Sequence, residues 1–180
     1  MNIEIISSSP RQGSLTHRLA LHLQKNIETK KEHNVGIIDV REWNLGLLQN
    51  VFSTIDNTPE KYKSLAERVF AAEAFIMVTP EYNGSYSPAL NNLFDHFPKQ
   101  SRKVFGLVTA SVGAMGGIRA SQQLLLLVPG LFGIPSPQLL ITPFVDKKFD
   151  AEGKLVDETF AKSVEVFVNE FIWLAEKIKA

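Results

Sequence analysis

Groups able to hold a phosphate are concentrated between residues 7 and 16, in the sequence SSSPRQGSLT. This segment follows an apolar run and precedes a helical pattern, so it leads into the amino end of a helix. Such an end presents unpaired N–H groups to an anion, and an arginine adds a forked, charge-assisted hydrogen bond. We therefore expect a phosphate cradle made of Ser9, Arg11, Ser14 and Thr16. The alternative is an ordinary turn in which Ser14 only caps the helix.

The kind of phosphate follows from what this loop lacks. It contains neither G-x-G-x-x-G nor G-x-x-x-x-G-K-[ST], so a monophosphate fits better than a pyrophosphate. The chain has no cysteine, so the loop also lacks the thiol nucleophile of phosphatases built on a similar loop. Phosphate binding without a nucleophile implies a bound cofactor.

Two further loops follow apolar runs. Residues 79–88 (TPEYNGSYSP) combine two prolines, two aromatic rings and several amide and hydroxyl groups, which suits a flat cofactor at the carboxyl end of a strand. Residues 110–119 (ASVGAMGGIR) carry three glycines, which allow close approach of the backbone, and N–H groups at a helix start can donate to an electronegative ring edge. The glycine run is also compatible with a flexible strand-to-helix turn.

Short apolar runs alternate with longer amphipathic segments, which is the pattern of a parallel sheet covered by helices. Right-handed crossovers then predict a doubly wound α/β sheet of order 2-1-3-4-5, with the three loops meeting at its switch point. Glu4 conflicts with a central strand because an unpaired buried carboxylate is costly, so we expect it near a strand end or paired. Strands are predicted at 2–7, 35–40, 74–79, 103–110 and 138–141, and helices near 14–29, 59–72, 87–97, 117–127 and 157–179.

Charge and composition narrow the class of protein. Lys plus Arg and Asp plus Glu number 19 each, which removes the basic footprint of a nucleic-acid binder. There is no cysteine and no ligand spacing among the four histidines, so we expect no metal site. No window approaches the ~18 apolar residues of a membrane span, and residues 1–180 are interpreted as a single cytoplasmic domain.

Three segments together resemble the NAD(P)H-dependent FMN reductase family, whose members have a flavodoxin-like fold. They are SPRQGSLT at 9–16, TPEYNGS at 79–85 and SVGAMGG at 111–117, and in order and spacing the match covers nearly the whole chain. The PEYN segment is the most specific. The resemblance implies that the first loop holds the FMN phosphate. It places Pro80, Glu81, Tyr82, Asn83 and Gly84 at the ring region and Ser111, Gly113 and Gly116 at the polar edge of the ring.

The resemblance also implies an activity. Hydride would pass from NADPH or NADH to FMN and then to a quinone, azo or similar small-molecule acceptor, in a homodimer or homotetramer. The cofactor carries this chemistry, so no side chain is expected to be catalytic. Two regions depart from the family: Thr16 stands where many relatives have asparagine, and Asn92 with 95–97 (DHF) stands where relatives often have lysine and tryptophan. The second departure leaves the substrate and the interface open.

Alternatives remain for the function and for one loop. A flavodoxin-type electron carrier and a flavin-binding protein without turnover compete with the reductase, although the neutral charge favours the reductase because such carriers are usually acidic. Residues 43–52 (WNLGLLQNVF) are unusually apolar for a connection, so they form either a partner surface or a loop folded over its own core. With residues 124–132, they are the predicted oligomer surfaces.

Overall fold

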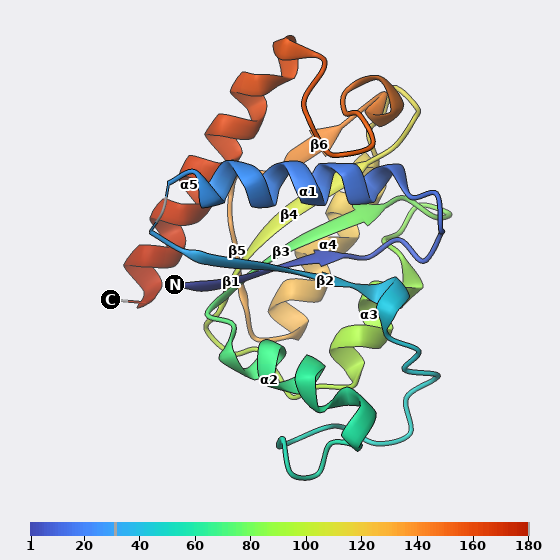
Figure 1. Ribbon diagram of the computed structural model, residues 1–180, viewed down its shortest axis with the longest axis vertical. Helices are drawn as coiled ribbons and strands as arrows, with labels where there is room; N and C mark the ends of the chain where they lie inside the picture. The colour runs from blue at the N-terminus through green and yellow to red at the C-terminus, as the bar shows by residue number, and fades with distance from the viewer. Residues whose placement is uncertain (31, 180) are drawn as a thin grey trace.

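The computed structural model describes residues 1–30 and 32–179, and it shows a parallel sheet with helices on both faces (Figure 1). The strands pair in the order β2-β1-β3-β4-β5, which confirms the predicted order and the flavodoxin-like architecture. A minor strand, β6, lies off this path and pairs with β4. The bounds are β1 (Asn2–Ser7), β2 (Asn34–Asp39), β3 (Ala74–Pro80), β4 (Val104–Ala110), β5 (Ile134–Pro135) and β6 (Leu140–Thr142).

The last position of the sheet differs from the single strand predicted at 138–141. Two short strands share it: β5 pairs with the start of β4, and β6 pairs with its end. Pro135 and Pro137 lack an N–H group, so the chain between the two strands cannot continue one ladder. The prediction therefore began too early for β6 and missed β5.

The helices form two layers (Figure 1). Helices α1 (Leu15–Glu28) and α5 (Ala161–Lys179) cover one face of the sheet, and α2 (Lys63–Ala71), α3 (Pro88–Asp95) and α4 (Ile118–Gly130) cover the other. The predicted helices at 59–72 and 157–179 each begin with a 3-10 turn instead. The 3-10 helices are η1 (Val40–Glu42), η2 (Glu60–Tyr62), η3 (Val145–Lys147) and η4 (Glu158–Phe160).

Side chains of the central strands alternate between two apolar cores. On β3, Ile76 and Val78 face the core beneath α1 and α5, whereas Phe75 and Met77 face the core beneath the other helices. Because both faces are buried, these strands are continuous apolar runs in the sequence. The carboxyl ends of β1, β3 and β4 therefore open at one edge of a rigid, two-sided scaffold.

Glu4 lies in the middle of β1 and is paired, as expected. Its two carboxylate oxygens accept hydrogen bonds from Arg68 of α2, at 2.9 Å from Nε and 2.6 Å from Nη2. The neighbouring residue on β2 is Gly36, and a Cβ there would lie 2.6 Å from Oε2 of Glu4. Because Gly36 has no side chain, it leaves the space that the Glu4–Arg68 ion pair occupies.

Among the described residues, no helix has both the length and the apolar character needed to cross a bilayer.

Candidate functional site

The loops that follow β1, β3 and β4 enclose a cavity of about 240 Å³ at the carboxyl edge of the sheet. The first two of these loops lie side by side at the right of Figure 1. Val145, from the segment after β6, also lines the cavity. The complete lining is Ser9, Arg11, Gly13, Ser14, Leu15, Thr16, Pro80, Glu81, Tyr82, Ala110, Ser111, Val112 and Val145.

The predicted phosphate residues all lie in this lining. Ser14 is the N-cap of α1, and its hydroxyl accepts a hydrogen bond from the N–H of His17 at 3.2 Å. The remaining first-turn N–H groups of α1 have no helical acceptor and are available to an anion at the helix end. Ser9 and Thr16 are buried at this position, whereas Arg11 is exposed. The structure therefore brings together a neutral donor cradle and one exposed cation.

A network of hydrogen bonds supports residues 8–14, which connect β1 to α1 and are called the phosphate loop below. Both the N–H and the hydroxyl of Ser8 donate to the carbonyl of Val78 on β3, at 3.1 and 3.0 Å. Asp39, at the end of β2, accepts from Nε of Arg41 through both carboxylate oxygens at 2.9 Å. Burial acts to raise the pKa of Asp39, but hydrogen bonds from Arg41 outweigh it and hold the pKa below its ordinary value. Because Arg41 also donates to the carbonyl of Gln12, the loop is anchored to two neighbouring strands.

His17, in the first turn of α1, contacts this network. Its Nδ1 is 2.9 Å from the hydroxyl of Ser7 and 3.3 Å from Oδ2 of Asp39. Burial lowers the pKa of His17, and this outweighs the opposing effect of Asp39. Ser7 and Asp39 approach the same ring nitrogen, which is not the arrangement of a nucleophilic triad, where the acid and the nucleophile use opposite nitrogens. We assign these residues to the support of the loop.

The second loop is held in a tight hairpin. Tyr82 and Ser85 exchange two backbone hydrogen bonds, at 2.8 and 3.0 Å. Between them, Asn83 and Gly84 both have positive φ, of 52° and 78°, as a type I′ turn requires. The specific Asn-Gly pair is therefore explained by backbone geometry. The turn presents Tyr82 to the cavity.

Tyr82 connects the second loop to the phosphate loop. The guanidinium carbon of Arg11 lies 4.9 Å from the centre of the Tyr82 ring, which is a cation–π contact. The Tyr82 hydroxyl is 3.5 Å from Oγ of Ser9. A second hollow, on the outer side of Tyr82, is lined by Pro10, Arg11, Glu81, Tyr82, Asn83 and Pro88. Tyr82 consequently forms a wall between the cavity and this hollow.

Glu81 connects the second loop to residues 110–119, the glycine loop. Its Oε2 accepts hydrogen bonds from the backbone N–H groups of Arg119 and Ala120, at 3.1 and 3.4 Å. These groups belong to the first turn of α4, so a carboxylate also compensates the positive end of the helix dipole. Glu81 lines the cavity and fixes the relative position of two of its walls.

The glycine loop contributes less to the cavity than its sequence suggests. Ser111 lines it, whereas Gly113 and Gly116 do not. The N–H of Gly116 already donates to the carbonyl of Gly113 at 3.2 Å, and a Cβ at Gly116 would lie 2.7 Å from the backbone nitrogen of Pro143. Gly116 is therefore accounted for by close packing. Gly84 also lies outside both linings and serves the turn.

Sequence reasoning missed Val145, which lines the cavity from the segment after β6. Backbone bonds place it: Ser111 donates to the carbonyl of Thr142, and Val145 donates to the carbonyl of Ser111, both at 3.1 Å. Apolar residues such as Val145 carry no chemical signal in a sequence. In the sequence, the only indication was that the strand predicted at 138–141 ends close to Val145.

The residues present fit a flavin mononucleotide. The α1 end with Ser9, Ser14 and Thr16 offers donors to a phosphate, and Tyr82, Pro80 and the backbone of 110–112 offer flat or apolar walls to a ring. The lining therefore combines polar donors with aromatic and apolar side chains. A ligand with an anionic tail and an aromatic head requires both.

The family model described as NADPH-dependent FMN reductase matches residues 1–145. The chain belongs to this family. An FMN-dependent NADPH-azoreductase from Staphylococcus haemolyticus (strain JCSC1435) is 33% identical over 177 residues, which cover 93% of this chain and 92% of that protein. Membership of the NADPH-dependent FMN reductase family makes the protein an oxidoreductase that uses FMN with NADPH.

Solved structures support the same fold. The flavoenzyme NAD(P)H:(acceptor) oxidoreductase FerB from Paracoccus denitrificans has a TM-score of 0.81 at 23% identity, covering 98% of this chain and 97% of its own. A mutant flavodoxin from Pseudomonas aeruginosa has a TM-score of 0.58 at 19% identity, covering 96% and 99%. Both are evidence for the flavodoxin-like architecture alone.

The departure from the family pattern in α3 has a structural explanation. Asn92 donates from Nδ2 to the carbonyl of Gly46 at 2.6 Å, and the carbonyl of His96 accepts from the N–H of Phe52 at 2.7 Å. These bonds hold the apolar segment 43–52 against α3. Within it, Phe52 is buried, so part of the segment folds over the core, whereas Leu47 is 84% exposed and the partner surface stays a prediction.

Proposed function

We propose that this member of the NADPH-dependent FMN reductase family delivers electrons to azo compounds, quinones or similar small-molecule acceptors. The observation that carries the proposal is the cavity where the α1 N-terminus, Arg11 and Tyr82 meet. The Staphylococcus haemolyticus relative is named for NADPH-dependent azo reduction, which supports an azo acceptor. Bound FMN would accept hydride from the nicotinamide and pass electrons to the acceptor.

The roles of the chain's own residues follow from their positions. Ser9, Ser14 and Thr16 would donate to the phosphate, and Arg11 would leave the Tyr82 ring to neutralise it. Tyr82 and Pro80 would border the ring, and Ser111 would donate at its polar edge. Glu81 is occupied by the N–H groups of α4, so we assign it to positioning. Asn83, Gly84, Gly113 and Gly116 would shape the loops.

An anaerobic visible spectrum of the FMN-loaded protein, before and after addition of NADPH, tests this function. We expect rapid bleaching of the bound flavin, and return of its absorbance when an azo dye or a quinone is added without oxygen. A parallel titration with NADH measures the nicotinamide preference. Stable FMN binding without bleaching would instead favour an electron carrier, and failure to bind FMN would remove the proposal.

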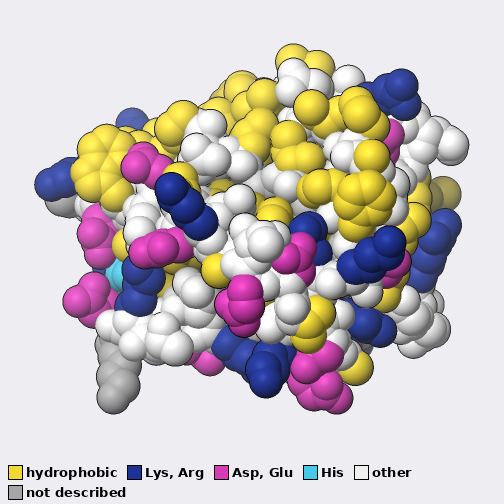
Figure 2. All heavy atoms as spheres, turned by 90° about the horizontal axis from the view of Figure 1, so that it is seen from above, with side chains coloured by type: hydrophobic (Ala, Val, Ile, Leu, Met, Phe, Trp, Pro, Cys, Tyr) yellow, Lys and Arg dark blue, Asp and Glu magenta, His cyan; other side chains and the backbone are white. Residues whose placement is uncertain are grey.

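We also propose that the protein is a homodimer or homotetramer. Leu126 and Phe132 at the predicted surface 124–132 are exposed, as is Leu47. Figure 2 shows a broad area of apolar side chains on the face seen from above, and α5 adds exposed Val166 and Trp173. Such areas are typical of interfaces. Sedimentation of the wild type and of Leu126→Glu and Trp173→Glu would identify the surface, and a monomer at micromolar concentration would refute the proposal.

Three general expectations accompany this function. The shared sheet between the two apolar cores supports one cooperative domain over residues 1–180. The need for NADPH supports a cytoplasmic location. The equal numbers of acidic and basic residues give no support for nucleic acid as a partner.

A further inference from the structure

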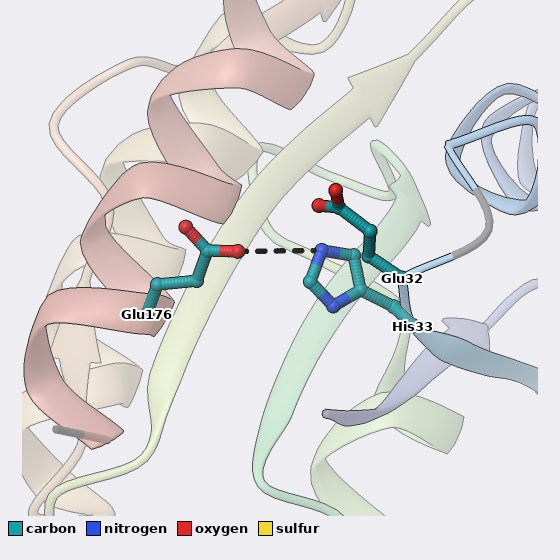
Figure 3. Close-up of side chains that lie close together, drawn as sticks. All are labelled: Glu32, His33 and Glu176. Atoms are coloured by element: carbon teal, nitrogen blue, oxygen red, sulfur yellow. Dashed lines mark ion pairs between the residues drawn. The ribbon is translucent and has the colours of Figure 1, made fainter.

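Three candidate metal ligands meet at the opposite edge of the sheet from the cavity. Glu32 and His33 directly precede β2, and Glu176 lies near the end of α5. In Figure 3, Glu176 points from α5 toward the His33 ring, and the Glu32 carboxylate lies beside that ring. One ligand atom from each residue lies within 4.8 Å of the other two. Residues separated by most of the chain are thus brought together here.

His33 is the feature that distinguishes this cluster from a group of surface acids. Its side chain is only 3% exposed, and neither ring nitrogen has a hydrogen-bond partner in residues 1–30 and 32–179. Nε2 lies 3.6 Å from Oε1 of Glu176, which is beyond hydrogen-bonding distance. Leaving a buried polar group without a partner is costly, so such groups are rare and require an explanation.

The spacing suits a cation between the two groups. Zinc binds nitrogen and carboxylate oxygen at about 2.0–2.2 Å in tetrahedral geometry, which places neighbouring ligand atoms about 3.4 Å apart. The observed 3.6 Å between Nε2 and Oε1 is close to this separation. Two carboxylates and one neutral imidazole also balance a divalent charge, and a water molecule would complete the tetrahedron.

Electrostatics around His33 act in both directions. Burial and then the charge of the α-ammonium of Met1 lower the pKa of His33, and the carboxylates of Glu176 and Glu32 oppose this effect. A neutral imidazole keeps the lone pair that a metal requires. The α-ammonium and Lys30 also repel a cation, so the site must derive its affinity from the two carboxylates.

We propose that Glu32, His33 and Glu176 bind a divalent cation of the zinc class. The ion would link the end of α5 to the segment that enters β2. Because the site lies at the amino ends of the strands, away from the cavity, its role would be structural. Closing so long a stretch of chain would limit fraying of α5 and stabilise the fold.

The experiment uses the full-length, FMN-loaded protein after treatment with a chelator. Titration with zinc chloride in a calorimeter should show one site per chain. Zinc at about 30 times its Kd should raise Tm by roughly 4–8 °C. His33→Ala and Glu176→Gln should both lose the heat signal and the rise in Tm.

Glu170→Gln is the matched control, because Glu170 is an exposed carboxylate on the same helix. This variant should retain the full response to zinc. Glu176 is half exposed, so Glu176→Gln should fold, and the visible spectrum of its bound FMN would verify this. No rise in Tm for the wild type, or an equal rise for Glu176→Gln, would overturn the proposal and leave an ordinary His33–Glu176 ion pair.

Discussion

Arg41 donates a hydrogen bond from Nη1 to the backbone carbonyl of Gln12 at 3.0 Å. Arg41 follows β2, and Gln12 is in the loop that follows β1, so this bond fixes the phosphate loop from a neighbouring strand. Asp39 orients the guanidinium by accepting from its Nε. The geometry of the predicted phosphate site thus depends on two residues that do not line it.

Asp39→Asn should therefore weaken FMN binding although Asp39 does not line the cavity. A hydrogen bond to a charged group contributes about 1.5–3 kcal/mol, and only part of this should reach the ligand through the loop. We expect an increase of about tenfold in the Kd of FMN, measured by flavin fluorescence, with a smaller change for riboflavin. Unchanged Kd values for both flavins would show that the loop holds its shape without Arg41.

Arg11→Ala should affect the two flavins unequally. If Arg11 binds the phosphate, its removal deletes a charge-assisted bond of about 1.5–3 kcal/mol and weakens FMN by about 10- to 100-fold. Riboflavin has no phosphate and should bind nearly as before. Arg11→Lys, which keeps the charge but loses the fork, should have an intermediate effect. Equal losses for FMN and riboflavin would instead assign Arg11 to its contact with Tyr82.

Substitution of three loop glycines by alanine should lower the free energy of unfolding by different amounts. Gly13 has open space around its Cβ position and no positive φ, so Gly13→Ala should be nearly neutral. Gly84 also has room but a φ of 78°, so Gly84→Ala should cost about 1–2 kcal/mol of unfolding free energy. At Gly116 a positive φ combines with a backbone clash, so the loss should be larger. Urea unfolding of the three variants measures this order, and a Gly116→Ala protein as stable as Gly13→Ala would contradict the packing explanation.

Much of the fold could be predicted because its signals are local. The strand at 2–7 was predicted at its observed bounds, and those at 74–79 and 103–110 to within one residue, because strands buried on both faces form continuous apolar runs. The edge of the sheet was harder, since a two-residue strand such as β5 contains too few residues to show a period. Glu4 was recognised as a conflict, but its partner Arg68 could be found only in three dimensions.

The candidate site was predictable to a similar depth. Polar residues such as Ser9 and Ser14 stand out in a sequence, and the structure brings them into one cavity. The role of a glycine is ambiguous in a sequence, because close packing, as at Gly116, and close approach of a ligand both require a residue without a side chain. The proposed cation site at Glu32, His33 and Glu176 could not be predicted from the sequence, since spacing along the chain does not reveal contacts between distant segments.

Lys103 gives the stability of the protein a predicted dependence on pH. Its Nζ donates to the carbonyl of Val69 at 3.1 Å and to Oε1 of Gln100 at 2.9 Å. Burial lowers the pKa of Lys103 from 10.5 to about 8. Between these two values the unfolded chain holds a proton that the folded protein has released, so this group makes the protein more stable as the pH rises from about 8 toward 10.5.

Urea unfolding of the wild type and of Lys103→Met at pH 7.5, 8.5 and 9.5 isolates this effect, because the other titrating groups are common to both proteins. The free energy of unfolding of the wild type should rise relative to the variant across this range. The slope should stay below the ~1.4 kcal/mol per pH unit of one full proton, since the ammonium is partly exposed. A difference that is constant or falls with pH would mean that the two hydrogen bonds keep Lys103 charged, and that they outweigh the cost of burying it.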